Sequence, residues 1–87
     1  MSRRHNPPRL LPVGDSALLV EFENEISEAV NRRVHALAHA LRRAPLPGVG
    51  EAVPAYRSLL IHYSPCDLTF DAVRSFVAGL LEQSDKM

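Results

Sequence analysis

His35 and His39 stand four residues apart, the spacing at which two side chains of one helix can bind the same metal ion. A structural zinc site needs further ligands. No cysteine or acidic residue follows the two histidines at a recognised metal-binding spacing, and both lie outside the apolar stripe of their helix. We therefore interpret them as residues of a solvated helix flank and predict no metal site.

The single cysteine and a turn aspartate are the other candidates for chemistry. Cys66 precedes an expected helix N-terminus, a position at which a thiolate can be stabilised. The carboxylate of Asp67 opposes that charge, and no general base is adjacent in the sequence. Asp15 follows Gly14 in an expected turn, where aspartate commonly makes local hydrogen bonds. For both residues we favour a structural role over catalysis.

The glycine cluster Pro47-Gly48-Val49-Gly50 has the wrong context for a phosphate-binding loop. Such a loop leads from a strand into a helix, whose N-terminal N–H groups then hold the phosphate. This cluster leads out of an expected helix into an expected strand. We predict that this chain binds no cofactor.

Composition narrows the class of protein. Ten Lys and Arg balance ten Asp and Glu, so the formal net charge is zero, which argues against nucleic acid or an anionic membrane as the main partner. One cysteine excludes an internal disulfide and suits a reducing compartment. No apolar stretch approaches the length of a bilayer-spanning helix or a secretory signal. We expect a soluble, cytoplasmic domain.

The first elements are expected to form a β-hairpin. Two apolar runs, Arg9–Val13 and Ser16–Phe22, flank the pair Gly14-Asp15, and the second run alternates in hydrophobicity. This pattern predicts a two-residue type II′ turn in which Gly14 supplies the positive φ.

The remaining elements are two helices that enclose a second pair of strands. Ser27 and Thr69 are suitable N-caps, and apolar residues recur at helical spacing after each of them. Prolines and a glycine stop the first helix. The expected segments are a helix over Glu28–Arg43, strands over Val49–Ala55 and Ser58–Tyr63, and a helix from Thr69 that frays from Glu82 onward.

The predicted fold class is α+β: a two-layer ββαββα domain with a four-stranded, mainly antiparallel sheet and both helices on one face. Met1–Pro8 is expected to be a disordered lead-in, and residues 9–84 a single domain.

Alternation assigns the two faces of the sheet. The more apolar set, expected to face the helices, comprises Leu18, Val20, Phe22, Leu59, Ile61 and Tyr63. Leu19, Glu21, Leu60 and His62 then point outward. A face built only for water would not need both leucines, so we predict a contact patch for a second domain, a partner subunit or another copy of the chain.

Topology separates the candidate residues. Asp15 is expected near 45–50 and 64–69, whereas Tyr56 and Arg57 are expected near 23–26, at the opposite end of the sheet. No nucleophile, base and orienting group therefore converge, and we predict no self-contained active site.

Several strings resemble the family that contains KipI, allophanate hydrolase subunit 1 and the B subunit of 5-oxoprolinase. They are Leu11–Phe22 (LPVGDSALLVEF), Asn31–Val34 (NRRV), Leu46–Val49 (LPGV) and Glu51–Leu60 (EAVPAYRSLL). The resemblance extends from about Arg9 to Leu81. The residues that we assign to the family motif are Pro12, Gly14, Asp15, Pro54, Tyr56, Arg57 and Ser58.

The resemblance implies a ββαββα N-terminal domain, in agreement with the pattern above. It also implies a cyclophilin-like domain further along the chain, which we expect these residues to lack. Two functions follow as expectations. One is a domain of an ATP-dependent amide- or lactam-hydrolysing enzyme that works with a companion subunit, the ATP belonging to the complex. The other is a regulatory module that binds a sensor histidine kinase.

Overall fold

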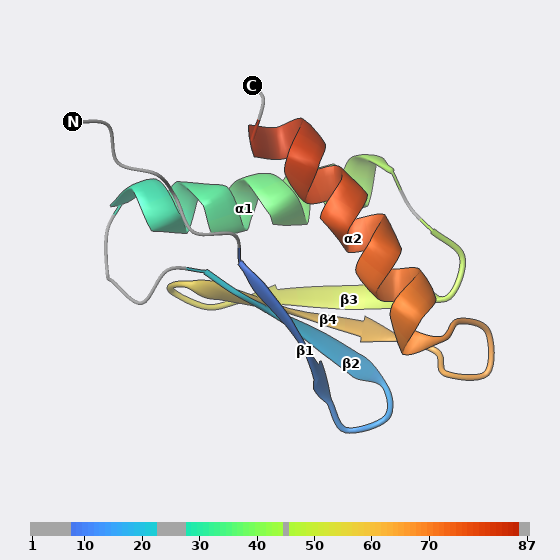
Figure 1. Ribbon diagram of the computed structural model, residues 1–87. Helices are drawn as coiled ribbons and strands as arrows, with labels where there is room; N and C mark the ends of the chain where they lie inside the picture. Colours follow the sequence, from blue (N-terminus) through green and yellow to red (C-terminus); the bar gives the residue numbers. More distant parts are fainter. Residues whose placement is uncertain (1–7, 23–27, 45, 86–87) are drawn as a thin grey trace.

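The computed structural model describes residues 8–22, 28–44 and 46–85. Its elements follow the expected order (Figure 1): β1 (Arg9–Val13), β2 (Ala17–Glu21), α1 (Glu28–Arg43), β3 (Val49–Pro54), β4 (Ser58–Tyr63) and α2 (Phe70–Asp85). The expected N-cap Ser27 and the expected lead-in, apart from Pro8, lie outside the described residues.

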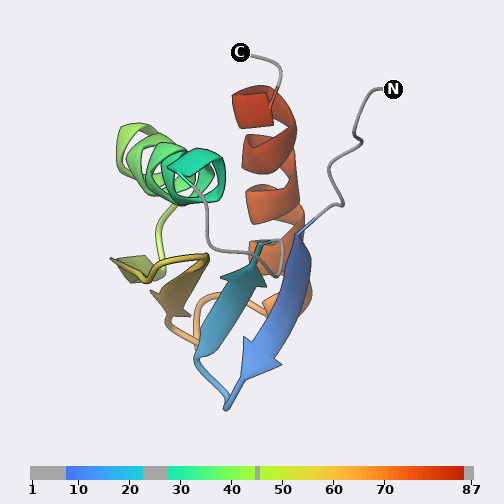
Figure 2. The same ribbon diagram turned by 90° about the vertical axis from the view of Figure 1, so that its left-hand side faces the viewer.

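The four strands form one sheet in the order β1-β2-β4-β3, and every pairing is antiparallel. Both helices lie on the same side of this sheet (Figure 2). In the part of the chain that the structure describes, no helix or strand covers the other side. The predicted α+β class and two-layer arrangement are confirmed.

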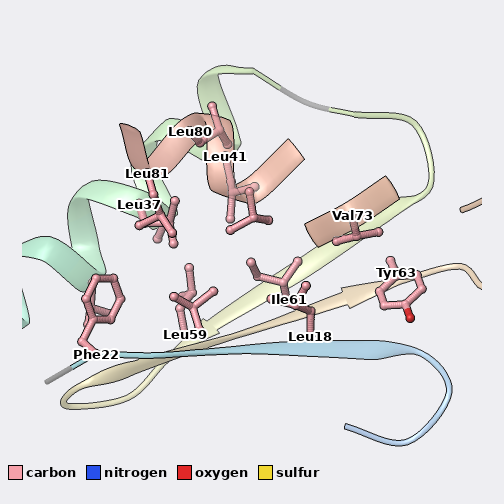
Figure 3. Close-up of a cluster of buried hydrophobic side chains, with 14 of the residues drawn as sticks. Leu18, Phe22, Leu37, Leu41, Leu59, Ile61, Tyr63, Val73, Leu80 and Leu81 are labelled. Carbon is pink, nitrogen blue, oxygen red and sulfur yellow. The ribbon is translucent and has the colours of Figure 1, made fainter. Parts of the chain in front are cut away.

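The core fills the space between the helices and the sheet (Figure 3). Leu18 and Ile61 lie opposite each other on the two central strands, and neither side chain has exposed surface. Leu37 of α1 and Val73 of α2 are equally buried on the helix side of the cluster, Leu37 near Leu59 and Val73 near Tyr63 (Figure 3). All six sheet residues assigned to the helix side are buried, so the predicted face assignment is correct.

The first hairpin differs from the expected one by one residue. Val13 lies opposite Ala17, so the loop has the three residues Gly14–Ser16, and the two-residue turn is wrong. The positive φ of Gly14 is confirmed at 60°. The longer loop pairs Leu10 with Val20 and places Leu10 against the core. A slip of one residue would move that side chain to the uncovered face.

The buried face and the end of α1 and the N-cap of α2 agree with the sequence pattern, whereas the end of α2 does not. In α1, the buried residues are Val30, Val34, Leu37, Ala38 and Leu41. The hydroxyl of Thr69 accepts a hydrogen bond from the N–H of Ala72 at 3.1 Å, the geometry of an N-cap. Helix α2 continues to Asp85 instead of fraying from Glu82, because no proline or glycine follows Gly79. No helix among the described residues is long and apolar enough to cross a membrane.

Gly48 joins α1 to β3 in a conformation that only glycine adopts easily. Its φ is +99°, and a Cβ placed there would lie 2.9 Å from Leu68 Cδ1 and 3.2 Å from Asp67 Cβ. The N–H of Ser64 also donates to the Gly48 carbonyl at 2.7 Å, which joins this connection to the chain that leads into α2. The close approach of Leu68 explains why residue 48 is a glycine, which sequence analysis interpreted only as a helix stop.

Gly14→Val should lower the melting temperature. A φ of +60° costs an L-residue about 1–2 kcal/mol, and a β-branched side chain is less suited still. In a domain of this size the loss corresponds to about 4–8 °C or more. Gly14→Asn is the matched control, since asparagine tolerates this region and the space around Gly14 is open. Thermal unfolding followed by circular dichroism measures both variants, and equal melting temperatures for all three proteins would contradict the expectation.

Gly48→Ala should destabilise the domain more than Gly14→Ala does. Both substitutions strain the backbone, but only the first also drives a methyl group into Leu68. Adding Leu68→Ala should return part of the loss, so that the two changes are non-additive. Chemical denaturation of the unaltered chain, Gly48→Ala, Leu68→Ala and the double variant measures this coupling, and strictly additive effects would show that the collision with Leu68 is unimportant.

Candidate functional site

The two histidines of α1 do not converge on a ligand site. Both side chains are exposed. His39 lines a shallow hollow of about 420 Å³ between α1 and α2, together with Arg43, Leu80, Gln83 and three alanines, whereas His35 does not line it. Among the described residues, no three histidine, cysteine, aspartate or glutamate side chains are grouped as metal ligands would be.

Asp15 lies at the end of the sheet where it was expected. The N–H of Tyr63 donates to the Ser16 carbonyl at 3.0 Å, and the N–H of Ser64 donates to the Gly48 carbonyl. These bonds join the first hairpin loop, the α1–β3 connection and the β4–α2 connection. The Asp15 side chain is exposed there. Cys66, a free thiol in the β4–α2 connection, is also exposed.

The turn between β3 and β4 lies at the opposite end of the sheet and is hydrogen-bonded both to the helix layer and to the sheet layer. The side-chain amide of Asn31 donates to the Tyr56 carbonyl at 3.1 Å, and the N–H of Phe22 donates to the Arg57 carbonyl at 2.9 Å. The guanidinium of Arg33 lies 5.0 Å from the centre of the Phe22 ring, a cation–π distance. Asn31 thus connects the NRRV string of α1 to the EAVPAYRSLL string of β3 and β4, and Arg33 connects it to Phe22, the last residue of the LPVGDSALLVEF string. The expected neighbours of this turn at 23–26 lie outside the described residues.

The family-motif residues therefore divide between the two ends of the sheet. Pro12, Gly14 and Asp15 belong to one end, and Pro54, Tyr56, Arg57 and Ser58 to the other. Tyr56 is 52% exposed, although its backbone carbonyl is held by the hydrogen bond from Asn31. The separation of Asp15 from Arg57 agrees with the topological argument, and these described residues form no shared active site.

The Gly48–Gly50 connection does not fit a nucleotide phosphate. It follows α1 and enters β3, so it presents no helix N-terminus to a ligand. The space beside Gly48 is occupied by the Leu68 side chain. The residues of this connection therefore do not fit the ATP that the resemblance implies.

The uncovered face of the sheet carries a continuous line of apolar side chains. Leu19 lies opposite Leu60 at the centre, Leu11 lies opposite Leu19, and Val53 lies opposite Leu60. We call Leu11, Leu19, Leu60 and Val53 the apolar row. It crosses all four strands, with Val53 42% exposed at one edge.

Polar residues flank the apolar row. Glu21 and His62 lie on the same face as Leu19 and Leu60, as predicted. A guanidinium nitrogen of Arg9 lies 3.4 Å from a carboxylate oxygen of Glu21, its cross-strand partner. The structure thus brings all four predicted contact residues to one face, and their role in binding a partner stays a prediction.

Sequence reasoning missed the outer parts of this face. Leu11 and Val13 belong to it because the three-residue loop sets the register of β1. Val53 belongs to it because it pairs with Leu60 across a strand that a register irregularity interrupts. Alternation showed that every second residue of β1 and β3 shares a face. Which of the two sets faces outward depends on the register of each hairpin.

Comparison with known proteins assigns the family. The family model of the carboxyltransferase domain, subdomain C and D, matches residues 8–87. Over 51 residues, the chain is 45% identical to the B subunit of 5-oxoprolinase from Bacillus subtilis strain 168, a match that covers 59% of this chain and 21% of that protein.

Solved structures agree with this assignment. A conserved uncharacterized protein of Pyrococcus horikoshii superposes with a TM-score of 0.84 and 38% identity, over 90% of this chain and 36% of that one. The N-terminal domain of the histidine kinase inhibitor KipI from Bacillus subtilis superposes with a TM-score of 0.73 and 32% identity, over 88% of this chain and 86% of that domain. The chain thus spans about a fifth of the Bacillus 5-oxoprolinase protein and about a third of the Pyrococcus protein. Since the family model covers nearly all of the chain, the protein belongs to the carboxyltransferase subdomain C and D family, with the 5-oxoprolinase B subunit and KipI among its relatives.

Proposed function

We propose that this chain is a binding domain of an ATP-dependent hydrolase, within a polypeptide of the 5-oxoprolinase B type. In this role it acts with a companion subunit and does not catalyse alone. The reaction adds water across the amide bond of a lactam such as 5-oxoproline and gives the open-chain amino acid. The hydrolysis of ATP to ADP and phosphate drives it.

The single observation that supports a binding role best is the apolar row. It crosses a whole sheet face that no described element covers, and Leu19 and Leu60 occupy its centre. A contiguous apolar surface of this kind is typical of an interaction site. The relationship to the B subunit of 5-oxoprolinase supports the hydrolase context.

The distribution of polar groups supports the absence of catalysis by this chain alone. Asp15 and Arg57 lie at opposite ends of the sheet, and the exposed Cys66 lies at the Asp15 end, in the connection after β4, away from Arg57. A catalytic site needs a nucleophile, a base and an orienting group within hydrogen-bonding reach of one another. We place the ATP in another part of the assembly, since the glycine connection here does not suit a phosphate.

A second candidate is a module that binds a sensor histidine kinase. The observation that favours it is the match to the N-terminal domain of KipI, at 32% identity over 88% of this chain. Under either function we place the protein in the cytoplasm, where the lone Cys66 would stay reduced. The genes adjacent to this one discriminate between the two candidates, because a companion hydrolase gene favours the first and a sporulation kinase gene the second.

The purified chain should show no turnover of 5-oxoproline or allophanate with ATP, because it lacks a converging set of catalytic groups. Release of inorganic phosphate and formation of the hydrolysed product measure this directly. Bacillus subtilis 5-oxoprolinase, assayed in parallel, shows that the conditions support turnover. Robust product formation by the isolated chain would contradict the proposal.

A hybrid enzyme tests the positive half of the proposal. In Bacillus subtilis 5-oxoprolinase, the part of the B subunit that matches this chain is replaced by residues 8–87. We expect ATP-dependent turnover to be retained, with at least about a tenth of the native kcat, since the catalytic groups belong to the rest of the assembly. The same exchange into KipI should then fail to restore kinase inhibition, whereas an active KipI hybrid and an inactive oxoprolinase hybrid would favour the second candidate.

A further inference from the structure

The apolar row lies at the centre of a larger apolar surface. Val13, 44% exposed, lies opposite Ala17 on the same face, beside the pair of Leu11 and Leu19. Ala17 is only 5% exposed although no described element covers this face. Neighbouring side chains therefore already crowd against one another on the open side of the sheet, as they do in half of a packed interface.

The charged groups that β1 and β2 place on this face pair with each other. Arg9 and Glu21 form a cross-strand ion pair at one end of the surface. The other polar side chains of the central strands on this face, Ser58 and His62, lie at its margins opposite Glu21 and Ala17. The surface therefore offers little attraction for a charged ligand and suits a neutral, apolar protein face.

The size of the face decides between its possible occupants. The strands are five or six residues long, so the face measures roughly 19 by 18 Å, or about 350 Å². A pair of copies packed through it would bury well under the roughly 1,200 Å² in total that a stable association of separate chains needs. An area of this size is instead ordinary for two domains of one polypeptide, which do not lose translational freedom when they meet.

The family model provides the corresponding neighbour. It describes a module of two subdomains, C and D, whereas the described residues form one sheet with two helices on one side. The Bacillus and Pyrococcus relatives are also between two and three times as long as this chain. A covalently attached neighbour would therefore be available in those proteins.

We propose that the uncovered face, centred on the apolar row, is the docking surface for the other subdomain of the carboxyltransferase-type module. The contact is weak between separate chains and persists where the two are joined. The inference deepens the proposed function and depends on it in one respect, that this domain works as part of a larger protein.

A titration tests the inference without any assay of activity. The ¹⁵N-labelled chain is titrated with the part of Bacillus subtilis KipI that follows its N-terminal domain, up to the millimolar range that weak domain contacts require. Amide signals of the strands around Leu19 and Leu60 should shift. Signals from the outer sides of α1 and α2 should not. Leu19→Lys with Leu60→Lys should weaken binding about tenfold or more, because two apolar contacts at the centre are replaced by charges.

The control variant adds the same two charges elsewhere. Ala36→Lys with Ala78→Lys alters exposed positions on the two helices and should bind as the unaltered chain does. Val53→Lys lies at the exposed edge of the row, where it cannot damage the core. It should weaken binding less than the double variant, and it keeps the test decisive if the double variant fails to fold.

Three outcomes would overturn the inference. They are no binding in the millimolar range, shifts confined to the helices, and self-association of the unaltered chain that Val53→Lys abolishes. The last would make a second copy the occupant. An inactive hybrid enzyme with intact binding contradicts only the proposed function. Binding that is unaffected by substitutions in the apolar row contradicts only this inference.

Discussion

Pairing between the two central strands determines most of this structure. β2 and β4 lie side by side although α1 and β3 separate them in the sequence. Their register sets Leu18 opposite Ile61 and Val20 opposite Leu59, and all four side chains are completely buried beneath the helices. The same register sets Leu19 opposite Leu60 on the other face. Because side chains alternate along a strand, the packing of one face fixes the composition of the other.

Both helices cover the same side of the four-stranded sheet. The apolar face on the other side therefore has no partner in the described structure. A small domain buries a limited share of its surface, so its margin of stability is thin. An additional contact on the uncovered face would stabilise both partners. The same apolar residues of the uncovered face would thus serve both the stability of the domain and the proposed docking. Neither role needs a catalytic group in this chain.

The family strings mark structural connections more than chemistry. Gly48 allows the close approach of Leu68, and Gly14 allows the loop that pairs Leu10 with the core strand. Asn31 fastens the turn that presents Tyr56. Asn31 thus joins α1 to one end of the sheet, whereas Gly14 and Gly48 shape the connections at the other end. The outward surface of each end remains available, as the exposure of Tyr56 shows.

Local pattern in the sequence determined the order of elements, the cap at Thr69 and the division of β2 and β4 into a helix side and an open side, because each of these depends on residues close together in the chain. It also provided the separation of Asp15 from Arg57, which follows from strand direction alone. Only the tertiary structure decided the hairpin register. Whether Leu11 or Leu10 faces the core depends on a loop one residue longer than its Gly-Asp signal suggested. The full apolar row was likewise decided by the tertiary structure: alternation had placed Leu19 and Leu60 on the open face, but Leu11 and Val53 join them only when the outer strands pair in their observed registers.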